Sequence, residues 1–358
     1  MWPSNELTIR LGLQWPIIQA PMAGTTTPEL AAAVSNTGGL GSLGLATIPA
    51  EAAGAQIEAF GELSGGPLNA NFFCHEEPVD VDMTGREMRI RLQRWYFELG
   101  LGEVPLPSVP FGTFGWEHVE QIQTHRPAVV SFHFGLPDDE LLAAVRETGC
   151  QVWSSATTVE EARWLEARGV DAVIAQGIEA GGHRGTFLGA DPEHQPGNFA
   201  LIPQVASAVD LPVIAAGGIV DGRTIAAALV LGASAVQIGT AFLRCPEASV
   251  HPRHRAALAG ASDNATRLTR LFSGKPARGL VNRYMDTYRD AEQFVAPFPA
   301  QLSIYGPLVQ NASEDEIADL LPLWSGQSAS LTRELPAAEL LATLAAETDE
   351  VLGKVGGA

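Results

Sequence analysis

The chain has 358 residues, enough for one large or two modest domains, and carries a formal charge of −19. An acidic surface of this kind repels nucleic acid and anionic lipid, so we expect neither as a partner. Apolar residues make up 46% of the chain but lie in short runs, none of which approaches a membrane span. The N-terminal stretch MWPSNELTIRLGLQWP lacks the basic start and long apolar centre of a signal peptide, so a cytoplasmic location is the expectation.

Apolar runs rich in Val, Ile and Ala recur along the chain, and each is followed by small or polar residues and then by helical spacing. We expect eight strands, at residues 16–21, 40–46, 68–73, 129–135, 151–157, 172–178, 212–219 and 235–242. Eight parallel strands with intervening helices predict an α/β fold of the (β/α)8 TIM-barrel type. The alternative, a doubly wound open sheet, is disfavoured because no G-x-G-x-x-G follows the first strand.

Two segments do not fit the strand–helix repeat. Residues 74–128 form a long excursion between the third and fourth strands, and residues 246–312 form another after the eighth strand. Long loops at the C-terminal mouth of a barrel carry chemistry, so we expect a helical lid subdomain there. On this interpretation residues 1–245 form the barrel and residues 313–358 form helices that pack back on it.

The stretch EAGGHRG, residues 179–185, follows the sixth strand and places one histidine among glycines. The pair Gly181 and Gly182 has no Cβ atoms, so backbone N–H groups can approach a flat or anionic ligand, next to His183. A simple turn is the commoner use of paired glycine, and the stretch alone does not decide between the two.

The loops after strands seven and eight, AAGGIVDG and VQIGTAF, contain further glycines. In barrels these two loops often bind phosphate through backbone N–H groups and the start of a short helix. Gly217, Gly218, Gly239 and Thr240 have these positions, and Gln237 lies just below on the strand. Because three such loops are neighbours around the rim, a phosphate site is favoured over three unrelated tight turns.

A phosphate site beside small-residue loops suits a phosphorylated planar cofactor, and flavin mononucleotide (FMN) is the obvious candidate. At the end of strand one, Ala20 to Met22 offer backbone that could lie along the isoalloxazine edge. Asn71 and Gln176 are amides on apolar strands, and a buried amide needs a hydrogen-bonding partner. The rim of a flavin would provide one, although neighbouring backbone would do so equally well.

Several motifs together resemble the class I branch of the nitronate monooxygenase family, formerly the 2-nitropropane dioxygenases. They are PIIQAPMAG, NTGGLGSLG, SFHFGLP, AQGIEAGGHRG, PVIAAGGI, VQIGTAF, SGKPARGLVN and LWSGQ, and they cover nearly the whole chain. The resemblance implies an FMN-bound TIM barrel with a helical cap that oxidises alkyl nitronates with molecular oxygen and without nicotinamide. It also implies FMN contacts from Met22, Asn71, Gln176, Gly181, Gly218 and residues 237–240, with His183 as the catalytic residue.

The chemistry of imidazole agrees with this role. A histidine titrates near neutral pH, so His183 can take a carbon-bound proton from a nitroalkane or hydrogen-bond an anionic nitronate. His133, at the end of strand four, resembles a second active-site histidine of class I, but a core histidine on an apolar strand is an equally good interpretation. The other histidines, among them His194, His251 and His254, lack metal-ligand spacing and receive no role, so no metal site is expected.

The late lid segment, residues 294–308, departs from the family. Class I enzymes carry tyrosine and lysine there, whereas this chain has Phe298, no lysine, and only Tyr305 as a loose counterpart. The departure bears on the substrate more than on the cofactor. Lys275 and Arg278, in SGKPARG, could neutralise a flavin phosphate or face solvent.

Three other functions compete with nitronate oxidation. An NAD(P)H-dependent FMN reductase of the enoyl-thioester or quinone type shares this barrel and needs no Rossmann motif, so the sequence leaves it open. An inosine-phosphate dehydrogenase relative would need a cysteine in the loop after strand six, and none is present. A flavin-storing protein without turnover is disfavoured by the placement of His183. The oligomeric state, including a homo-oligomer, is not decided.

Overall fold

A computed structural model describes residues 2, 5–189 and 191–356. Its main sheet has eight parallel strands in the order β1-β9-β8-β6-β5-β4-β3-β2. A parallel bridge between Ile18 and Leu40 joins β1 to β2, so the sheet closes on itself. The predicted (β/α)8 barrel is therefore confirmed, and an open doubly wound sheet is excluded. The strands are β1 (Ile17–Gln19), β2 (Gly41–Gly44), β3 (Leu68–Phe73), β4 (Val129–His133), β5 (Gln151–Ala156), β6 (Ala172–Gln176), β8 (Val213–Ala216) and β9 (Ala235–Ile238).

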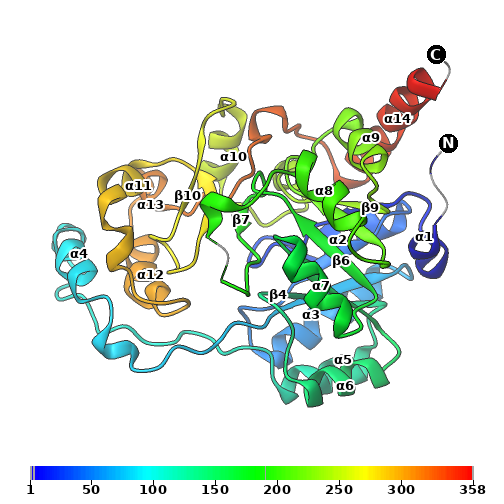
Figure 1. Cartoon of the computed structure of the whole chain (residues 1–358). Helices are drawn as coiled ribbons and strands as arrows, with labels where there is room; N and C mark the ends of the chain where they lie inside the picture. The colour runs from blue at the N-terminus through cyan, green and yellow to red at the C-terminus, as the bar shows by residue number, and fades with distance from the viewer. Residues whose placement is uncertain (1, 3–4, 190, 357–358) are drawn as a thin grey trace.

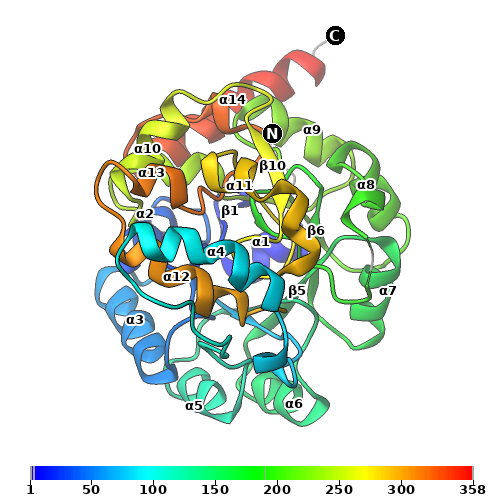
Figure 2. The same cartoon turned by 90° about the vertical axis from the view of Figure 1, so that its left-hand side faces the viewer.

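The barrel helices form a ring outside these strands (Figure 2). They are α2 (Pro28–Asn36), α3 (Ala50–Leu63), α5 (Trp116–His125), α6 (Asp139–Glu147), α7 (Val159–Ala167), α8 (Asn198–Ala206), α9 (Gly222–Val230) and α14 (Ala337–Gly356). Side chains at several helix starts accept a hydrogen bond from a backbone N–H three residues on, which fixes where the helix begins. Thr27, Asp138, Thr158 and Asp221 do so.

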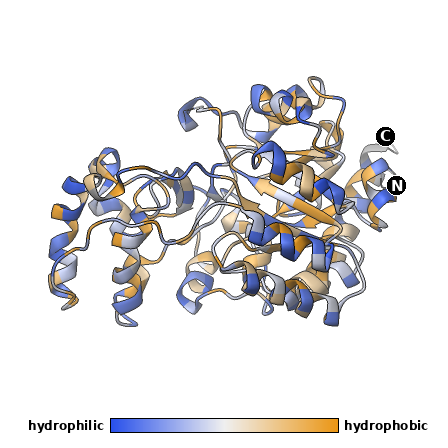
Figure 3. Cartoon of the chain, turned by 90° about the horizontal axis from the view of Figure 1, so that it is seen from below, coloured by the Kyte–Doolittle hydropathy of each residue, from blue (hydrophilic) through white to orange (hydrophobic). Residues whose placement is uncertain are grey.

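The strands are apolar because both faces are covered. Their side chains fill the barrel interior or meet the helices, and the chain is accordingly orange along the strands in Figure 3. At the N-terminal end of the barrel, helix α1 (Glu6–Leu11) places Leu7 against a cluster that includes Ile18 and Trp153. With that end closed, the opposite mouth is where a ligand can enter.

Helix α14 is the eighth helix of the barrel. It packs between α9 and α2, with Leu341 and Leu344 fully buried against Ile225. Everything between β9 and α14 is therefore one long connection at the C-terminal mouth. This connection includes α10 (Pro252–Ala259), α11 (Arg283–Thr287), α12 (Gln301–Asn311) and α13 (Ile317–Leu320).

A separate cap lies over the C-terminal mouth, to the left of the barrel in Figure 1. Helix α4 (Arg86–Glu98), from the excursion after β3, packs there with α11, α12 and α13 in one apolar cluster. Trp95, Tyr284, Ile304 and Leu320 belong to this cluster. We propose that the cap extends at least to Leu320 rather than ending at residue 312. Residues 1, 3, 4, 190, 357 and 358 of the expected ranges lie outside the described residues.

Sequence reasoning missed a small antiparallel sheet at the mouth. Strand β10 (Thr266–Thr269) pairs with β11 (Ala277–Leu280), and β11 pairs with β7 (Gly182–His183). The pair Ala277–His183 ties the loop after β6 to the long connection after β9. A strand of two residues, one of them glycine, gives no periodic signal, so β7 cannot be recognised from the sequence.

None of the helices in the described part of the chain combines the length and the apolar content that crossing a bilayer requires.

Candidate active site

A cavity of about 350 Å³ opens at the carboxyl ends of the strands, and we call it the inner pocket. Its volume lies at the lower end of the range for ligand sites. The thirteen residues expected at the site all line it: Ala20, Met22, Asn71, His133, Gln176, Gly181, Gly182, His183, Gly217, Gly218, Gln237, Gly239 and Thr240. Its other lining residues are mostly small or apolar, and none of the described lining residues is Asp, Glu, Lys or Arg.

Four backbone N–H groups at one corner of the inner pocket form an anion cradle. Gly217 and Gly218 have φ values of 108° and 70°, a region that disfavours other residues. Within the described chain, the N–H groups of Gly217, Gly218, Gly239 and Thr240 donate to no other protein group. Unpaired backbone N–H groups on neighbouring loops can bind an anion such as phosphate.

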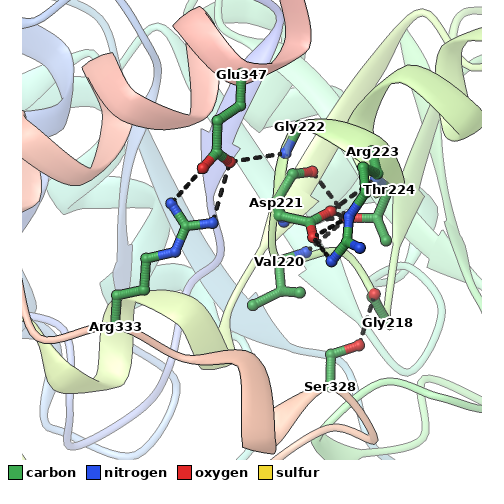
Figure 4. Close-up of polar contacts among 9 residues, drawn as sticks. All are labelled: Gly218, Val220, Asp221, Gly222, Arg223, Thr224, Ser328, Arg333 and Glu347. Atoms are coloured by element: carbon green, nitrogen blue, oxygen red, sulfur yellow. Dashed lines mark hydrogen bonds and ion pairs between the residues drawn. The ribbon is translucent and has the colours of Figure 1, made fainter. Parts of the chain in front are cut away.

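A third segment, residues 325–328, closes the same corner. Ser328 donates from its hydroxyl to the Gly218 carbonyl at 2.7 Å (Figure 4), and the Gly326 N–H donates to Thr240 Oγ1 at 2.9 Å. A Cβ on Gly181 would lie 2.5 Å from the Gly326 nitrogen, so the two glycine loops touch through backbone. The sequence motif LWSGQ is therefore part of the site, although its residues carried no assigned role.

The nearby start of helix α9 is already occupied by carboxylates. Asp221 accepts from the Thr224 N–H at 3.0 Å, and Glu347 of α14 accepts from the Gly222 N–H at 3.2 Å (Figure 4). Arg333 binds the same Glu347 at 2.6 and 3.1 Å. An anion in the pocket would consequently be bound by the N–H groups of the anion cradle and not by the positively polarised N-terminus of α9.

Hydrogen bonds hold the backbone of the His183 loop in place. The His183 carbonyl accepts from Gln176 Nε2 at 3.0 Å and from His133 Nε2 at 3.1 Å, and the Gly185 N–H donates to Gln176 Oε1 at 2.8 Å. Because a carbonyl can only accept, His133 carries its proton on Nε2. Its Nδ1 then accepts from the Ser155 hydroxyl at 3.0 Å.

The His183 ring lies against aromatic side chains at the mouth of the pocket. Its Nε2 is 2.8 Å from Ser273 Oγ, and its ring centre is 5.4 Å from that of Phe298 and 5.5 Å from that of Trp324. Ser273 is buried, and its hydroxyl also donates to the Lys275 carbonyl at 3.3 Å. The ring is thus fixed on one edge, and its other nitrogen is left for a ligand.

Burial keeps both histidines neutral. Burial, with smaller contributions from the neighbouring His133 and Lys275, lowers the pKa of His183 from 6.5 to about 3. It also lowers the pKa of His133 to about 4, against a smaller opposite effect from its bond to the His183 carbonyl. At neutral pH the pocket therefore contains two uncharged imidazoles.

Of the two partners that the sequence left open for Asn71 and Gln176, a flavin or protein groups, the structure shows protein groups. Gln176 uses both ends of its amide on the His183 loop, and Asn71 donates to the Ser131 carbonyl at 3.1 Å and to its hydroxyl at 2.9 Å. Gln237 Oε1 is the buried oxygen without a partner in this pocket among the described residues. This oxygen can still accept a hydrogen bond from a ligand. The sequence alone could not distinguish Gln237 from the other two amides in this respect.

Other residues discussed from the sequence lie elsewhere. Tyr305 is buried in the cap and donates to the Leu320 carbonyl, so it does not reach the pocket. Arg278 donates from Nε to the Ile178 carbonyl at 3.0 Å and does not line the pocket. His254 was given no role as a loop residue, but it lies in α10, lines the pocket and has Nε2 3.1 Å from Ser325 Oγ.

A second, larger cavity of about 1440 Å³ lies between the barrel and the cap, and we call it the outer cavity. Phe298 is the one described residue that lines both cavities. Lys275 lines the outer cavity, with its ammonium 4.5 Å from the centre of the Phe134 ring. It therefore does not lie in the cradle suggested for a flavin phosphate.

Residues 5–347 match the family described as nitronate monooxygenase. The chain belongs to the nitronate monooxygenase family. It is 43% identical to a nitronate monooxygenase of Pseudomonas aeruginosa, over 96% of this chain and 99% of the relative. It is 40% identical to a probable nitronate monooxygenase of Bacillus subtilis, over the same shares. The resemblance inferred from the motifs is confirmed, and the protein is an oxidoreductase.

Solved structures agree with this family assignment. A nitroalkane oxidase from Streptomyces ansochromogenes has a TM-score of 0.89 and 38% identity, over 98% of this chain and all of the other. FabK from Thermotoga maritima has a TM-score of 0.76 and 28% identity, over 99% of each chain. The barrel and its cap are therefore shared beyond the nitronate monooxygenases.

The depressed histidine pKa values predict how stability depends on pH. The folded protein keeps His183 neutral down to about pH 3, whereas the unfolded chain protonates near pH 6.5. The contribution of the neutral His183 to stability is consequently complete above about pH 6.5 and is lost as the pH falls toward about 3. We expect the thermal midpoint to fall over this interval and the fall to be smaller in His183→Asn. An identical pH dependence in both proteins would contradict the neutral, buried ring.

Proposed function

We propose that the protein oxidises alkyl nitronates with molecular oxygen, using FMN bound in the inner pocket. The proposal rests on one observation. The anion cradle and the neutral His183 ring line the same pocket, and none of the described residues lining that pocket is Asp, Glu, Lys or Arg. The cradle suits a phosphate, and the imidazole suits a substrate with an acidic carbon-bound proton or its anion.

The residues present fit FMN. The N–H groups of Gly217, Gly218, Gly239 and Thr240 would hold the phosphate. The unpaired Gln237 Oε1 would accept a hydrogen bond from the polar edge of the flavin. Ala20, Met22, Asn71, Gly181 and Gly182 would line the remaining faces of the cofactor.

A bound flavin supplies the acceptor for the substrate's electrons and passes them to oxygen. The chain itself has to orient the nitronate and manage one proton. Ser273 donates to the Lys275 carbonyl, an arrangement in which His183 carries its proton on Nε2 and keeps a lone pair on Nδ1. His183 Nδ1 would then take the proton from a neutral nitroalkane, because a neutral imidazole is the basic form.

His133 acts on this chemistry through His183. Both of its ring nitrogens are engaged, one by the His183 carbonyl and the other by Ser155. The sequence suggested that His133 is either a second active-site histidine or a core residue. We infer that it is a positioning residue and not a second base.

The competing NAD(P)H-dependent reductase would need a place for a nicotinamide dinucleotide. The outer cavity is large enough, but four carboxylates line it, from Glu76, Glu77, Asp191 and Glu292. Three basic residues line it as well: Lys275, Arg270 and the buried Arg184, which donates to Gln195 and to two carbonyls. The remaining excess of one negative charge opposes a pyrophosphate, so nitronate oxidation is favoured.

The cradle can be tested by cofactor content. The purified protein should be yellow and release FMN on denaturation. Gly218→Asp places a carboxylate against the phosphate and adds a side chain at a left-handed backbone position, so flavin binding should be lost. Gly61→Asp, at an exposed helix position with open space around it, is the matched control and should bind FMN normally. A folded Gly218→Asp protein with full flavin content would show that the cradle is misplaced.

The role of His183 can be tested with two substrate forms. His183→Asn should keep the fold and the flavin, since the hydrogen bonds to the loop come from its backbone. Loss of a general base typically costs about 100- to 10,000-fold, so oxidation of a neutral nitroalkane should fall by that factor. Oxidation of the preformed nitronate should fall much less. Equal losses on both forms would make His183 an anion partner only, and the exposed His194→Asn variant serves as control.

A further inference from the structure

One short segment crosses the anion cradle. Residues 325–334, which we call the strap, lie between α13 of the cap and α14 of the barrel and begin within the motif LWSGQ. The strap makes a hydrogen bond to each of the three glycine loops of the inner pocket. The bonds run from the Gly326 N–H to Thr240 Oγ1 at 2.9 Å, from the Gln327 N–H to the Glu179 carbonyl at 2.9 Å and, as Figure 4 shows, from the Ser328 hydroxyl to the Gly218 carbonyl at 2.7 Å. Loops that follow three different strands are thus joined through one stretch of chain.

The strap fits against these loops only because residue 326 is glycine. A Cβ on Gly326 would lie 2.8 Å from the Glu179 carbonyl oxygen and 3.1 Å from the Gly181 nitrogen, both closer than van der Waals contact. The backbone of Gly326 is not in the left-handed region, so only the lack of space disfavours alanine there. The strap and the loop after β6 are therefore in direct backbone contact.

Two arginines fasten the strap beyond the cradle. Arg333 binds both carboxylate oxygens of Glu347 in α14, at 2.6 and 3.1 Å, and Glu347 also accepts from the Gly222 N–H at 3.2 Å (Figure 4). Arg244 donates to the Thr332 carbonyl of the strap at 3.2 Å. Gly222 begins α9, and Arg244 ends the turn after β9, so both contacts reach elements that continue directly from the cradle loops. The far end of the strap is therefore anchored to the same two strand–helix units that its near end crosses.

The cradle needs such support because its backbone is rich in glycine. Glycine has more conformational freedom than any other residue, and fixing it around a ligand costs free energy. Gly217 and Gly218 are adjacent, and the Ser328 hydroxyl fixes the orientation of the second carbonyl. N–H groups that are held in place before an anion arrives bind it without that cost. A contact that orients the loop can therefore raise the affinity for a phosphate without touching the phosphate.

We propose that the strap holds the anion cradle in the geometry that a phosphate requires, with Gly326, Ser328 and the Arg333–Glu347 pair as positioning residues. These residues act through the cradle loops, and the N–H groups of the cradle remain the groups that touch the phosphate. The inference rests on the proposed binding of FMN in the inner pocket. It concerns how tightly the phosphate of the cofactor is held and not the reaction at the flavin ring.

The test compares FMN with riboflavin, which lacks the phosphate. Dissociation constants for both flavins are measured by flavin fluorescence on the full-length chain freed of its cofactor. Ser328→Ala removes a hydrogen bond that orients the cradle, so FMN should bind about tenfold more weakly. Gly326→Ala pushes the strap away from the loop after β6 and should weaken FMN binding by at least that factor. Riboflavin, which has no phosphate for the cradle to hold, should lose much less affinity in both variants.

A double variant tests whether the strap acts as one unit. Arg333→Met breaks a partly exposed ion pair, so on its own it should weaken FMN binding by only about threefold. Because the pair serves to hold the strap, Ser328→Ala combined with Arg333→Met should weaken binding by about tenfold and not by about thirtyfold, the product of two independent losses. Ser328→Thr keeps the hydroxyl and should bind FMN nearly as the wild type does.

Two control variants lie away from the strap. Ser207→Ala removes a hydroxyl that donates to the Pro203 carbonyl at 2.8 Å, and Lys354→Met removes an exposed ion pair on α14 itself. Both should leave the dissociation constant for FMN unchanged.

The opposite results would overturn the inference. Equal losses of FMN and riboflavin affinity in Ser328→Ala would reduce the strap to general support of the fold, and an unchanged affinity for FMN would leave it without any role at the cradle. A fully multiplicative loss in the double variant would remove the Arg333–Glu347 pair from the proposal. If Gly326→Ala does not fold, Ser328→Ala and Ser328→Thr still test the strap. A wild type that binds FMN no more tightly than riboflavin would instead contradict the phosphate site of the proposed function, which distinguishes the two failures.

Discussion

Closure of the parallel sheet is the constraint on which the rest of the molecule depends. The contact between β1 and β2 through Ile18 and Leu40 turns eight strands into a ring, and parallel strands in a ring all end at the same mouth. The loops after β1, β6, β8 and β9 share one pocket because of this, although the ends of β1 (Gln19) and β9 (Ile238) are 219 residues apart in sequence. Closure of the opposite end around Trp153 leaves that mouth as the place for a ligand.

Within this frame, the pocket is built almost entirely from uncharged groups. Backbone N–H groups form the anion cradle, and two neutral imidazoles line the same pocket. The charges that do lie close by, such as Arg184 and Glu347, are engaged in hydrogen bonds that fix the loops. A site of this kind would bind an anion through oriented dipoles, whose effect is strong where water is excluded.

The sequence predicted what depends on periodicity and on glycine. All eight barrel strands were located from their apolar runs, and the glycine loops were placed on one rim because barrel topology requires it. It could not predict features that depend on contacts between distant segments. The strand at His183 forms only because β11 lies beside it, and the role of His133 follows from a bond to a carbonyl fifty residues away. His254 and Ser328 reach the pocket from the long connection, whose course no local pattern specifies.

The most direct test of nitronate oxidation is anaerobic mixing of the flavin-loaded protein with an alkyl nitronate and, separately, with NADH and NADPH, while the flavin absorbance is followed. The account predicts that the nitronate changes the flavin spectrum within the time of one turnover and that oxygen then restores it. Neither nicotinamide should bleach the flavin on that time scale. Rapid bleaching by NADH or NADPH, with no response to nitronate, would contradict the account and identify the barrel as a reductase.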